Sequence, residues 1–510
     1  MEISTNKSSD KLYASLFAIF LVAMAVFKLT YIGRLNLCFD EAYYWGWAQR
    51  LAVNYHDQPG MVAWWIKFFT SILGNSEFAV RFGAVVSSSL TSIALFLLAK
   101  ILTKSSKIAF LTIATLHITP LGTAGSILMM HDTVTILFWV LAILFFSKFI
   151  LTQKPFWLYL WATASALAVY GKVSSFLMFF CVFVFLLLSK NNRKWFFNKH
   201  SYLSLLLFFF ILGPHLIWNL RHNFETYRHV FGLGTTGVPS YSSSSFFDFL
   251  GGQLVFTSPV LFVLIIMALI YFGFTKRKEL TDQALLLISF TAPILLIFFF
   301  LSLWSKTEAN WTNIAYPPAL VMVFYYIDKI RWKNLTKTIV LSFGLLLAII
   351  PTIVILFPSI IETVGIEVKP QDDRSNEVYG WDTFGNELSE ILETQPENTF
   401  VFSYNYQIPA ILGFYLKGHP RTYCLPNDWR RRNQYDIWGG WENLKGRNGL
   451  YVYHTPAGEE IMHFITKAFK SVEPYKKIET IRGNTVIRTV TIIQCKDFLG
   501  TDKTTQPQGY

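Results

Sequence analysis

The chain has 510 residues, of which 53% are apolar, 17% aromatic and only 15% charged, and its formal net charge is +12. Soluble domains carry about 25% charged residues, so this composition excludes an ordinary soluble enzyme and indicates a surface that largely faces lipid. The basic residues lie in short clusters between apolar runs. That arrangement argues against a nucleic-acid-binding protein and favours orientation in a membrane.

Apolar runs of membrane-spanning length recur along the chain. A transmembrane helix needs about 20 mostly apolar residues, and about eleven runs approach that length. The first run is too long for a signal-peptide core and has no cleavage site after it, so we expect it to remain as a span. Pro120 and Gly122 predict a bend or break in the third span. The expected spans are residues 12–32, 79–102, 108–128, 133–150, 156–170, 173–189, 202–220, 249–274, 283–303, 313–327 and 338–357.

The basic clusters predict which side of the membrane each loop faces. Cytoplasmic loops carry an excess of lysine and arginine. With the N-terminus in the cytoplasm, that side receives the basic turns at residues 100–107, 148–154, 190–199, 276–278 and 329–337. The opposite side receives Asp40, Glu41, Asp57, Asp132, Lys172, Arg221, Lys306 and Glu308. We therefore predict that the chemistry takes place on the extracytoplasmic face.

The C-terminal part of the chain is polar and is expected to form a domain on the same outer side. We place a transmembrane domain at residues 1–357, with a functional loop at 33–78, and a soluble domain at 358–510. The expected elements of the soluble domain are strands at 399–403 and 449–453, helices at 408–416 and 459–469, and a hairpin at 477–493 that turns at Gly483-Asn484. The predicted fold is a mainly α polytopic membrane protein with a C-terminal extracytoplasmic α/β domain.

The four cysteines, Cys38, Cys181, Cys424 and Cys495, match neither a disulfide framework nor a zinc site. Cys424 and Cys495 lie in the same outer segment and could pair there. Two buried free thiols explain them equally well.

Asp40 and Glu41 are the first candidates for catalysis. They follow the first span directly, and Tyr43, Tyr44 and Trp45 come behind them. An acceptor that attacks an activated sugar must lose a proton, and a carboxylate within hydrogen-bond reach can take it. We expect Asp40 to be this base and Glu41 to share or orient the role, with only one side chain facing the site if the backbone is extended. The alternative is a solvated acidic loop.

Asp132 is a further carboxylate at an outer span end, suited to acid–base work or metal binding. The alternative is a helix N-cap, where aspartate is favoured. Basic groups on the same side could hold the phosphate of a lipid-linked donor and neutralise it as it leaves. These groups are Arg81, Lys172, Arg221 and Lys306. Arg81 and Arg221 could instead snorkel at span ends, and Lys306 could simply pair with Glu308. The histidines at positions 56, 131, 222 and 229 lack metal-ligand spacing, so no histidine metal site is expected.

Several motifs resemble those of one known family. The Asp40-Glu41 pair with Ala-Tyr-Tyr-Trp behind it resembles glycosyltransferases of the C-fold superfamily, in the group of protein O-mannosyltransferases and lipid A aminoarabinose and galacturonic acid transferases. The stretch 55–64 resembles that group's Asp-His-Pro-Pro loop, although Gln58 and Gly60 depart from its pattern. This likeness implies that His56 and Asp57 contact substrate. Further similar stretches are Glu77–Arg81, His131–Thr133, Tyr170–Lys172, Glu308–Trp311 and Asn433–Trp438.

The resemblance implies a polyprenyl-phosphate-linked sugar donor and transfer with inversion at the sugar carbon. It implies Asp40 as the catalytic residue, phosphate contacts from the basic residues, and a substrate-binding place for Glu308. The expected acceptor is lipid A or lipopolysaccharide core at the periplasmic side of a bacterial inner membrane, with no nucleic acid and no cofactor. A divalent metal is not indicated, although related oligosaccharyltransferases use one. The alternatives are a protein O-mannosyltransferase-like enzyme, a lipid-linked sugar transporter or flippase, and a scaffold with inert loops.

Overall fold

The computed structural model describes residues 7–235, 242–276, 280–357, 360, 369–370, 372–426, 432–455 and 458–500. Arg277 and Lys278 of the basic cluster at 276–278, and parts of the predicted soluble domain, lie outside these residues. The chain divides into two compact units. The helical unit comprises Met1–Ile32, Gln58–Val62 and Arg81–Pro358, and the mixed unit comprises Gly33–Asp57, Ala63–Val80 and Ser359–Tyr510. Most of the loop predicted at 33–78 thus belongs with the C-terminal segment.

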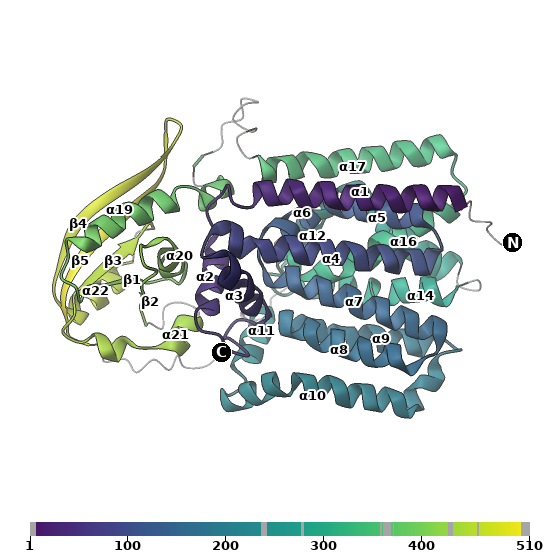
Figure 1. Ribbon diagram of the computed structural model, residues 1–510, viewed down its shortest axis with the longest axis horizontal. Helices are drawn as coiled ribbons and strands as arrows, with labels where there is room; N and C mark the ends of the chain where they lie inside the picture. The colour runs from purple at the N-terminus through teal and green to yellow at the C-terminus, as the bar shows by residue number, and fades with distance from the viewer. Residues whose placement is uncertain are drawn as a thin grey trace. The chain divides into compact units, whose positions relative to one another are not determined.

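The helical unit consists of apolar helices, several of which run roughly parallel in Figure 1. Among the described residues, six helical stretches are long and apolar enough to cross a membrane. They are α1 (Lys7–Tyr31), α4 (Glu77–Thr103), α7 (His131–Thr152), α10 (Lys199–Arg221), the pair α14 (Asp282–Ser289) and α15 (Ala292–Leu301), and α17 (Asn334–Leu356). The number rises to eight if two sharply bent pairs each count as one span. The expected multi-pass helical fold is therefore present.

The remaining expected spans coincide with bent or shorter helices. The bent pairs are α5 (Ser106–Ile118) with α6 (Pro120–Ile127), and α12 (Ser243–Thr257) with α13 (Pro259–Ile270) and the short π-helical stretch Tyr271–Thr275. The shorter helices are α8 (Pro155–Gly171), η1 (Val173–Phe176) with α9 (Leu177–Leu188), and η5 (Ala309–Ala315) with α16 (Tyr316–Lys329). Every predicted span thus overlaps helical structure, and a total of about eleven crossings stays a prediction.

The predicted break at Pro120 is present and has a local cause. α5 and α6 meet at an angle of 74°. Thr119 ends the first helix and caps the second, where its hydroxyl accepts a hydrogen bond from the Gly122 N–H at 3.4 Å. A Cβ atom on Gly122 would lie 1.8 Å from the Leu116 carbonyl oxygen, so only glycine fits. A second bend, of 101° between α12 and α13, was not predicted; Ser258 has a φ of 89° there, directly before Pro259.

A chain of buried polar side chains connects three helices of this unit. Lys28 of α1 is buried, and its ammonium lies 3.2 Å from the Ser88 hydroxyl and 3.1 Å from Nδ1 of His117. The other ring nitrogen of His117 lies 2.8 Å from the Ser92 hydroxyl. Buried polar groups must find partners, and these contacts satisfy Lys28 while joining α1, α4 and α5.

The mixed unit contains a five-stranded sheet in the order β2-β1-β3-β5-β4. Its strands are β1 (Phe400–Ser403), β2 (Thr422–Cys424), β3 (Gly449–Tyr453), β4 (Phe469–Arg482) and β5 (Thr485–Phe498). β1 pairs in parallel with β2 and β3, whereas β5 is antiparallel to β3 and β4. The predicted strands and the hairpin turning at Gly483 are confirmed, and the hairpin strands are longer than expected.

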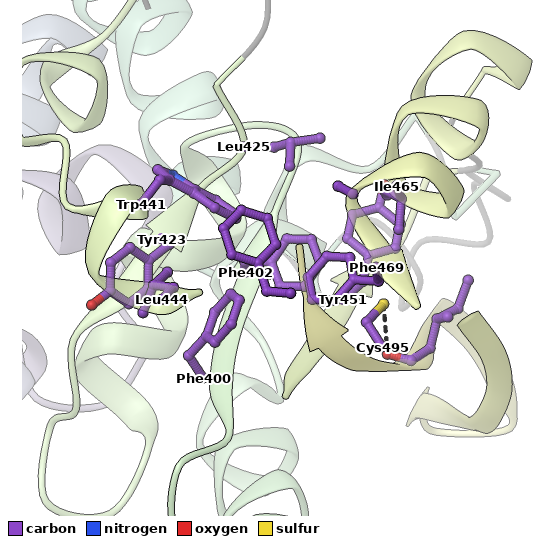
Figure 2. Close-up of a cluster of buried hydrophobic side chains, with 13 residues drawn as sticks. Phe400, Phe402, Tyr423, Leu425, Trp441, Leu444, Tyr451, Ile465, Phe469 and Cys495 are labelled. Atoms are coloured by element: carbon purple, nitrogen blue, oxygen red, sulfur yellow. Dashed lines mark hydrogen bonds between the residues drawn. The ribbon is translucent and has the colours of Figure 1, made fainter. Parts of the chain in front are cut away.

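An aromatic core covers one face of this sheet (Figure 2). Phe400 and Phe402 project from β1 on the same face because strand side chains alternate. The Phe402 ring stacks on Phe469 with centroids 5.5 Å apart, and Trp441 packs edge-on against both β1 rings. A β-carbon on Gly449 would lie 2.8 Å from the Phe402 ring, so glycine admits this packing.

Cys424 and Cys495 are both buried and both free. Cys424 lies on β2 and Cys495 on β5, with β1 and β3 between them. Neighbouring strands are about 4.8 Å apart, so the two strands lie about 14 Å apart, beyond the reach of a disulfide. The two thiols are therefore core residues.

The helices of the mixed unit include one that replaces an expected loop. They are α2 (Phe39–Ala48), most of α3 (Met61–Leu73), α19 (Trp381–Glu393), α20 (Gln407–Tyr415), α21 (Gln434–Trp438) and α22 (Glu459–Ala468). The patterns at 408–416 and 459–469 predicted α20 and α22 correctly. α2 was expected to be a loop, and it packs on α20 through Trp45 and Phe414, whose ring centroids are 5.1 Å apart.

Candidate active site

The acidic pair lies in the first turn of α2, where a capping box separates the roles of its two side chains. Cys38 is the N-cap, and the Glu41 carboxylate accepts a hydrogen bond from the Cys38 N–H at 3.1 Å. Such a reciprocal cap satisfies backbone donors that the helix leaves unpaired. Glu41 is fully buried, with 0% exposure. The backbone here is helical and not extended, and Glu41 stabilises the helix that presents Asp40.

This geometry separates two substitutions of Glu41. Glu41→Gln keeps a side chain that can complete the cap, so we expect the protein to remain folded and to retain activity within a few-fold. Glu41→Ala removes the cap and leaves a buried donor without its acceptor, which should cost about 1–3 kcal/mol of stability. Thermal unfolding of both variants in detergent measures the difference. Loss of activity in a stably folded Glu41→Gln protein would instead assign a chemical role to this carboxylate.

Asp40 is a carboxylate with an altered proton affinity. The Tyr406 hydroxyl, at the start of α20, donates a hydrogen bond to Oδ1 of Asp40 at 3.1 Å. Burial raises the pKa of Asp40 to about 6, the Tyr406 hydrogen bond opposes this rise, and the charges of Glu377 and Asp57 add to it. A carboxylate with this pKa is mostly ionised at pH 7 and binds a proton more strongly than an ordinary aspartate. These are the properties of a general base.

Further carboxylates and phenols of the mixed unit surround this group. Tyr43 donates a hydrogen bond to Asp57 at 2.8 Å and accepts one from the Gln434 N–H at 2.6 Å. Its ring lies 4.6 Å from the ring of Tyr406. We call Asp40, Asp57, Glu377, Tyr43 and Tyr406 the acidic cluster. Burial, together with the nearby carboxylates, raises the pKa of both tyrosines, so they remain neutral donors.

Two motifs from distant parts of the chain hold this cluster in place. The His56 N–H donates to the Gln434 side chain at 2.7 Å, and the His56 side chain is buried. Glu377 accepts a hydrogen bond from the Phe39 N–H at 3.2 Å, beside the start of α2. The stretch 433–438 and residues 55–57, which both resemble stretches of one family, are therefore in contact. Carboxylate oxygens are the ligands that hard divalent cations prefer, so Asp40, Asp57 and Glu377 are the groups here that could meet one.

The helical unit holds a second polar site around Asp132. The Lys172 ammonium lies 3.0 Å and 3.2 Å from the two Asp132 oxygens, and the Asn310 amide donates to Oδ2 at 3.0 Å. The two charged side chains are only 14% and 12% exposed. The N-cap of α7 is Met130, without a side-chain cap. The helix-cap alternative for Asp132 is therefore wrong, and its carboxylate pairs with Lys172.

Tight packing brings Lys172 to this position. A Cβ atom on Gly171 would lie 2.4 Å from the Thr135 hydroxyl, so glycine lets the end of α8 approach α7 closely. The Gln58 side chain accepts a hydrogen bond from the Val173 N–H at 3.1 Å, directly after Lys172. Gln58 is one of the two departures from the family's loop pattern, and here it fixes the lysine turn.

The other predicted substrate-binding residues differ in their burial and contacts. Arg81 is buried, with 3% exposure, and donates to the Ile32 carbonyl at 2.9 Å, so it does not snorkel but holds the end of the first span. Arg221 is exposed at the end of α10. Lys306 and Glu308 lie 3.6 Å apart with 87% and 60% exposure, as the pairing alternative predicted. Such exposed pairs contribute little to stability.

Tyr406, Glu377 and Asn310 contact these groups but were not predicted as site residues. Tyr406 and Glu377 lie more than 300 positions from Asp40 and carry no local signal of a contact with it. Asn310 stood inside one of the family-like stretches, where its amide could have been proposed as a partner for a carboxylate.

Tyr406→Phe is expected to change the pH dependence of the reaction. The substitution removes the hydrogen bond that lowers the pKa of Asp40, so that pKa should rise by about one unit. The acid limb of the rate–pH profile should move upward by the same amount, and the rate should fall about twofold at pH 7, should fall more at pH 6 and should recover at pH 8. A profile that keeps its midpoint would show that Tyr406 does not tune Asp40.

The chain is similar in sequence to several known proteins. The sequence model of the family described as "Dolichyl-phosphate-mannose-protein mannosyltransferase" matches residues 57–218. The lipid A galacturonosyltransferase RgtD of Rhizobium johnstonii is 25% identical over 304 residues, which are 58% of this chain and 61% of that protein. The undecaprenyl phosphate-alpha-4-amino-4-deoxy-L-arabinose arabinosyl transferase 2 of Proteus mirabilis is 30% identical over 118 residues, 21% of each chain. The chain thus spans less than two thirds of either relative.

Solved structures share the fold at low sequence identity. ArnT from Cupriavidus metallidurans has a TM-score of 0.62 at 12% identity, with 94% of this chain and 98% of that chain covered. The archaeal oligosaccharyltransferase AglB from Archaeoglobus fulgidus has a TM-score of 0.52 at 11% identity, with 86% and 69% covered. These similarities confirm the expected fold of apolar helices with a small C-terminal α/β domain.

Proposed function

We propose that the chain is a C-fold glycosyltransferase of the group that contains protein mannosyltransferases and lipid A sugar transferases, and that it transfers one monosaccharide from a polyprenyl phosphate to an extracytoplasmic acceptor. The family match over residues 57–218 and the similarity to RgtD support this family, and the solved ArnT structure supports the fold. The proposed acceptor is lipid A or lipopolysaccharide core, and the proposed location is the bacterial inner membrane with the reaction on its periplasmic side.

The names of similar proteins support this choice of donor and acceptor. One solved ArnT structure is bound to undecaprenyl phosphate, and the Proteus relative is named for an undecaprenyl phosphate donor. RgtD is named for lipid A. A protein acceptor, as in the mannosyltransferases, is the second candidate and is favoured by the family match over residues 57–218.

The proposed reaction is a single displacement at the sugar carbon. The acceptor oxygen attacks that carbon while the Asp40 carboxylate takes its proton. The bond from carbon to phosphate oxygen breaks, and the polyprenyl phosphate leaves with the electron pair. Because attack and departure occur on opposite faces, the configuration inverts. No cofactor takes part, and the proposal requires no metal.

The other groups would bind the substrates. Lys172 would bind the donor phosphate through its ammonium. Asp132 positions this ammonium, and Asn310 in turn donates a hydrogen bond to Asp132. Asp57 and the tyrosines of the acidic cluster would hydrogen-bond sugar hydroxyls. The exposed Arg221, Lys306 and Glu308 remain able to reach a headgroup at the surface.

The raised pKa of Asp40 is the observation that best supports the proposal. Among the described residues, no lysine or arginine forms an ion pair with this carboxylate, and the charges of Glu377, Asp57 and Glu41 raise its pKa. A neighbouring cation would stabilise the ionised form of a structural aspartate. A general base needs a higher proton affinity, which the absence of a cation preserves.

Mass spectrometry of lipid A, core oligosaccharide and glycoproteins from deletion and wild-type cells tests the proposal. A one-sugar difference in lipid A or core is the expected result, and the same difference in a protein would select the second candidate. Purified protein that moves intact lipid-linked sugar across vesicles without cleaving it would overturn the enzymatic assignment in favour of transport.

A further inference from the structure

A buried glutamine of α12 holds η5 and the first residue of α16. Gln253 is fully buried, and its side-chain amide donates a hydrogen bond to the Ala309 carbonyl at 3.0 Å. Its side-chain oxygen accepts one hydrogen bond from the Thr312 hydroxyl at 2.7 Å and another from the Tyr316 hydroxyl. Because a buried amide is costly unless it is hydrogen-bonded, these contacts fix Gln253 and η5 against each other.

The residue before Gln253 restrains the same position of η5. A Cβ atom on Gly252 would lie 2.6 Å from the Cβ atom of Ala309, so glycine allows α12 to approach η5 this closely. Two neighbouring residues of α12 therefore hold Ala309, one by close packing and one by a hydrogen bond. Asn310 is the next residue of the chain, and its backbone position is restrained with that of Ala309.

Asn310 links this restraint to the pair of Asp132 and Lys172. Its amide donates to Oδ2 of Asp132 at 3.0 Å, and the Lys172 ammonium lies 3.0 Å and 3.2 Å from the two oxygens of that carboxylate. A carboxylate that contacts only a lysine can turn about its side-chain bonds. The hydrogen bond from Asn310 restricts that rotation, so it also restricts where the carboxylate holds the ammonium.

We propose that Gln253 is a positioning residue, which acts through η5 and Asn310 on the Lys172 ammonium. The proposal rests on the proposed function, in which Lys172 binds the donor phosphate. A displacement of about 1 Å at a reacting group can cost about 100-fold in rate, so a residue that holds η5 in place can affect the reaction without touching a substrate. The alternative is that Gln253 only joins α12 to η5 and contributes to stability alone.

Binding of undecaprenyl phosphate to the full-length protein in nanodiscs tests this proposal. Undecaprenol, which lacks the phosphate, is the second probe, and neither probe depends on which sugar is transferred. We expect Gln253→Leu to weaken the binding of undecaprenyl phosphate about tenfold, as removal of a supporting residue behind a charged contact does. The affinity for undecaprenol should stay unchanged. A purely structural role would not separate the two probes.

A double-mutant cycle with Asn310 shows whether Gln253 acts through this residue. Asn310→Ala removes the contact with Asp132 directly and should also weaken phosphate binding about tenfold. Gln253→Leu/Asn310→Ala should again lose about tenfold, because both substitutions interrupt the same series of contacts. A loss of about 100-fold in the double variant would mean independent effects and would overturn the proposal.

A second glutamine provides the matched control. Gln153 is the C-cap of α7, at the opposite end of that helix from Asp132, and its amide donates to the Ile150 carbonyl at 2.8 Å and to the Asn192 side chain at 3.2 Å. Gln153→Leu should lower the unfolding temperature and leave both affinities unchanged. If Gln253→Leu does not fold, Gln253→Leu/Tyr316→Phe takes its place, because it also removes the hydroxyl that the single variant leaves unpaired.

Lys172→Gln separates failure of this proposal from failure of the proposed function. It should weaken the binding of undecaprenyl phosphate about 10- to 100-fold, because a charged contact is lost. If Lys172→Gln weakens this binding and Gln253→Leu does not, the role of Gln253 is overturned and the phosphate contact of the proposed function stands. If Lys172→Gln binds undecaprenyl phosphate like the wild type, that phosphate contact is wrong and the role of Gln253 falls with it.

Discussion

Asp40→Asn is expected to lower the rate of sugar transfer by about 10²- to 10⁴-fold while it increases the stability of the protein at pH 7. Asparagine has nearly the same shape and can still accept the hydrogen bond from Tyr406. It cannot take a proton from the acceptor. The loss of rate would therefore come from the missing base rather than from a damaged fold.

The gain in stability follows from the pKa of Asp40. Its value of about 6 in the folded protein lies above the ordinary value of 3.8. The folded state then binds the proton more tightly than the unfolded state, so the stability contributed by this group is present below pH 4 and is lost as the pH rises through about 6. At pH 7 the ionised carboxylate destabilises the fold by about 1–3 kcal/mol, which Asp40→Asn removes.

Thermal unfolding and transfer assays over pH 4–8 test both parts of this expectation. The unfolding temperature of Asp40→Asn should exceed that of the wild type at pH 7, and the gap should close toward pH 4. The exposed Asp382 of α19 offers a matched control, because Asp382→Asn should alter neither rate nor pH dependence. An Asp40→Asn protein with wild-type activity would exclude Asp40 as the base, and one that unfolds at a lower temperature would show that the carboxylate is structural.

Local sequence patterns predicted most of the helices and strands, because these elements are determined largely by residues that lie close together in the chain. The apolar runs became helices, the hairpin turned at Gly483, and Pro120 broke a helix where its missing N–H and the following glycine demanded it. β2 escaped prediction because three residues give too short a pattern. α2 escaped because its aromatic residues resemble a membrane-surface loop, and only the Cys38–Glu41 cap identifies it as a helix.

Only those site residues were predictable whose side-chain type and position in the sequence already indicate a function. Asp40, Asp132 and Lys172 stand out as ionisable groups beside apolar spans. Tyr406 and Glu377 come from the C-terminal segment, and no periodicity or spacing connects them to the N-terminal acidic pair. Arg81 shows that a basic residue at a span end can also hold a backbone carbonyl, a contact that its residue type alone does not predict.

Lys172→Gln is expected to lower kcat/KM for the lipid-linked donor by about 10²- to 10³-fold, if its ammonium stabilises the departing phosphate. Asp132→Asn should lower it less, because it leaves the lysine charge in place and removes only the group that positions it. Both single substitutions leave a half-buried charge without its partner, and each should cost up to about 3 kcal/mol of stability.

The double variant Asp132→Asn/Lys172→Gln separates a catalytic pair from a structural one. Removing both charges relieves the unpaired group, so the double variant should be more stable than either single variant. Its activity should nevertheless stay as low as that of Lys172→Gln, because the phosphate still lacks a cation. Lys417→Gln, which breaks the exposed pair of Lys417 with Glu393, is the matched control and should change neither property. Recovery of transfer in the double variant would show that the pair only holds α7 and α8 together, and the proposed phosphate contact would then have to come from another basic residue.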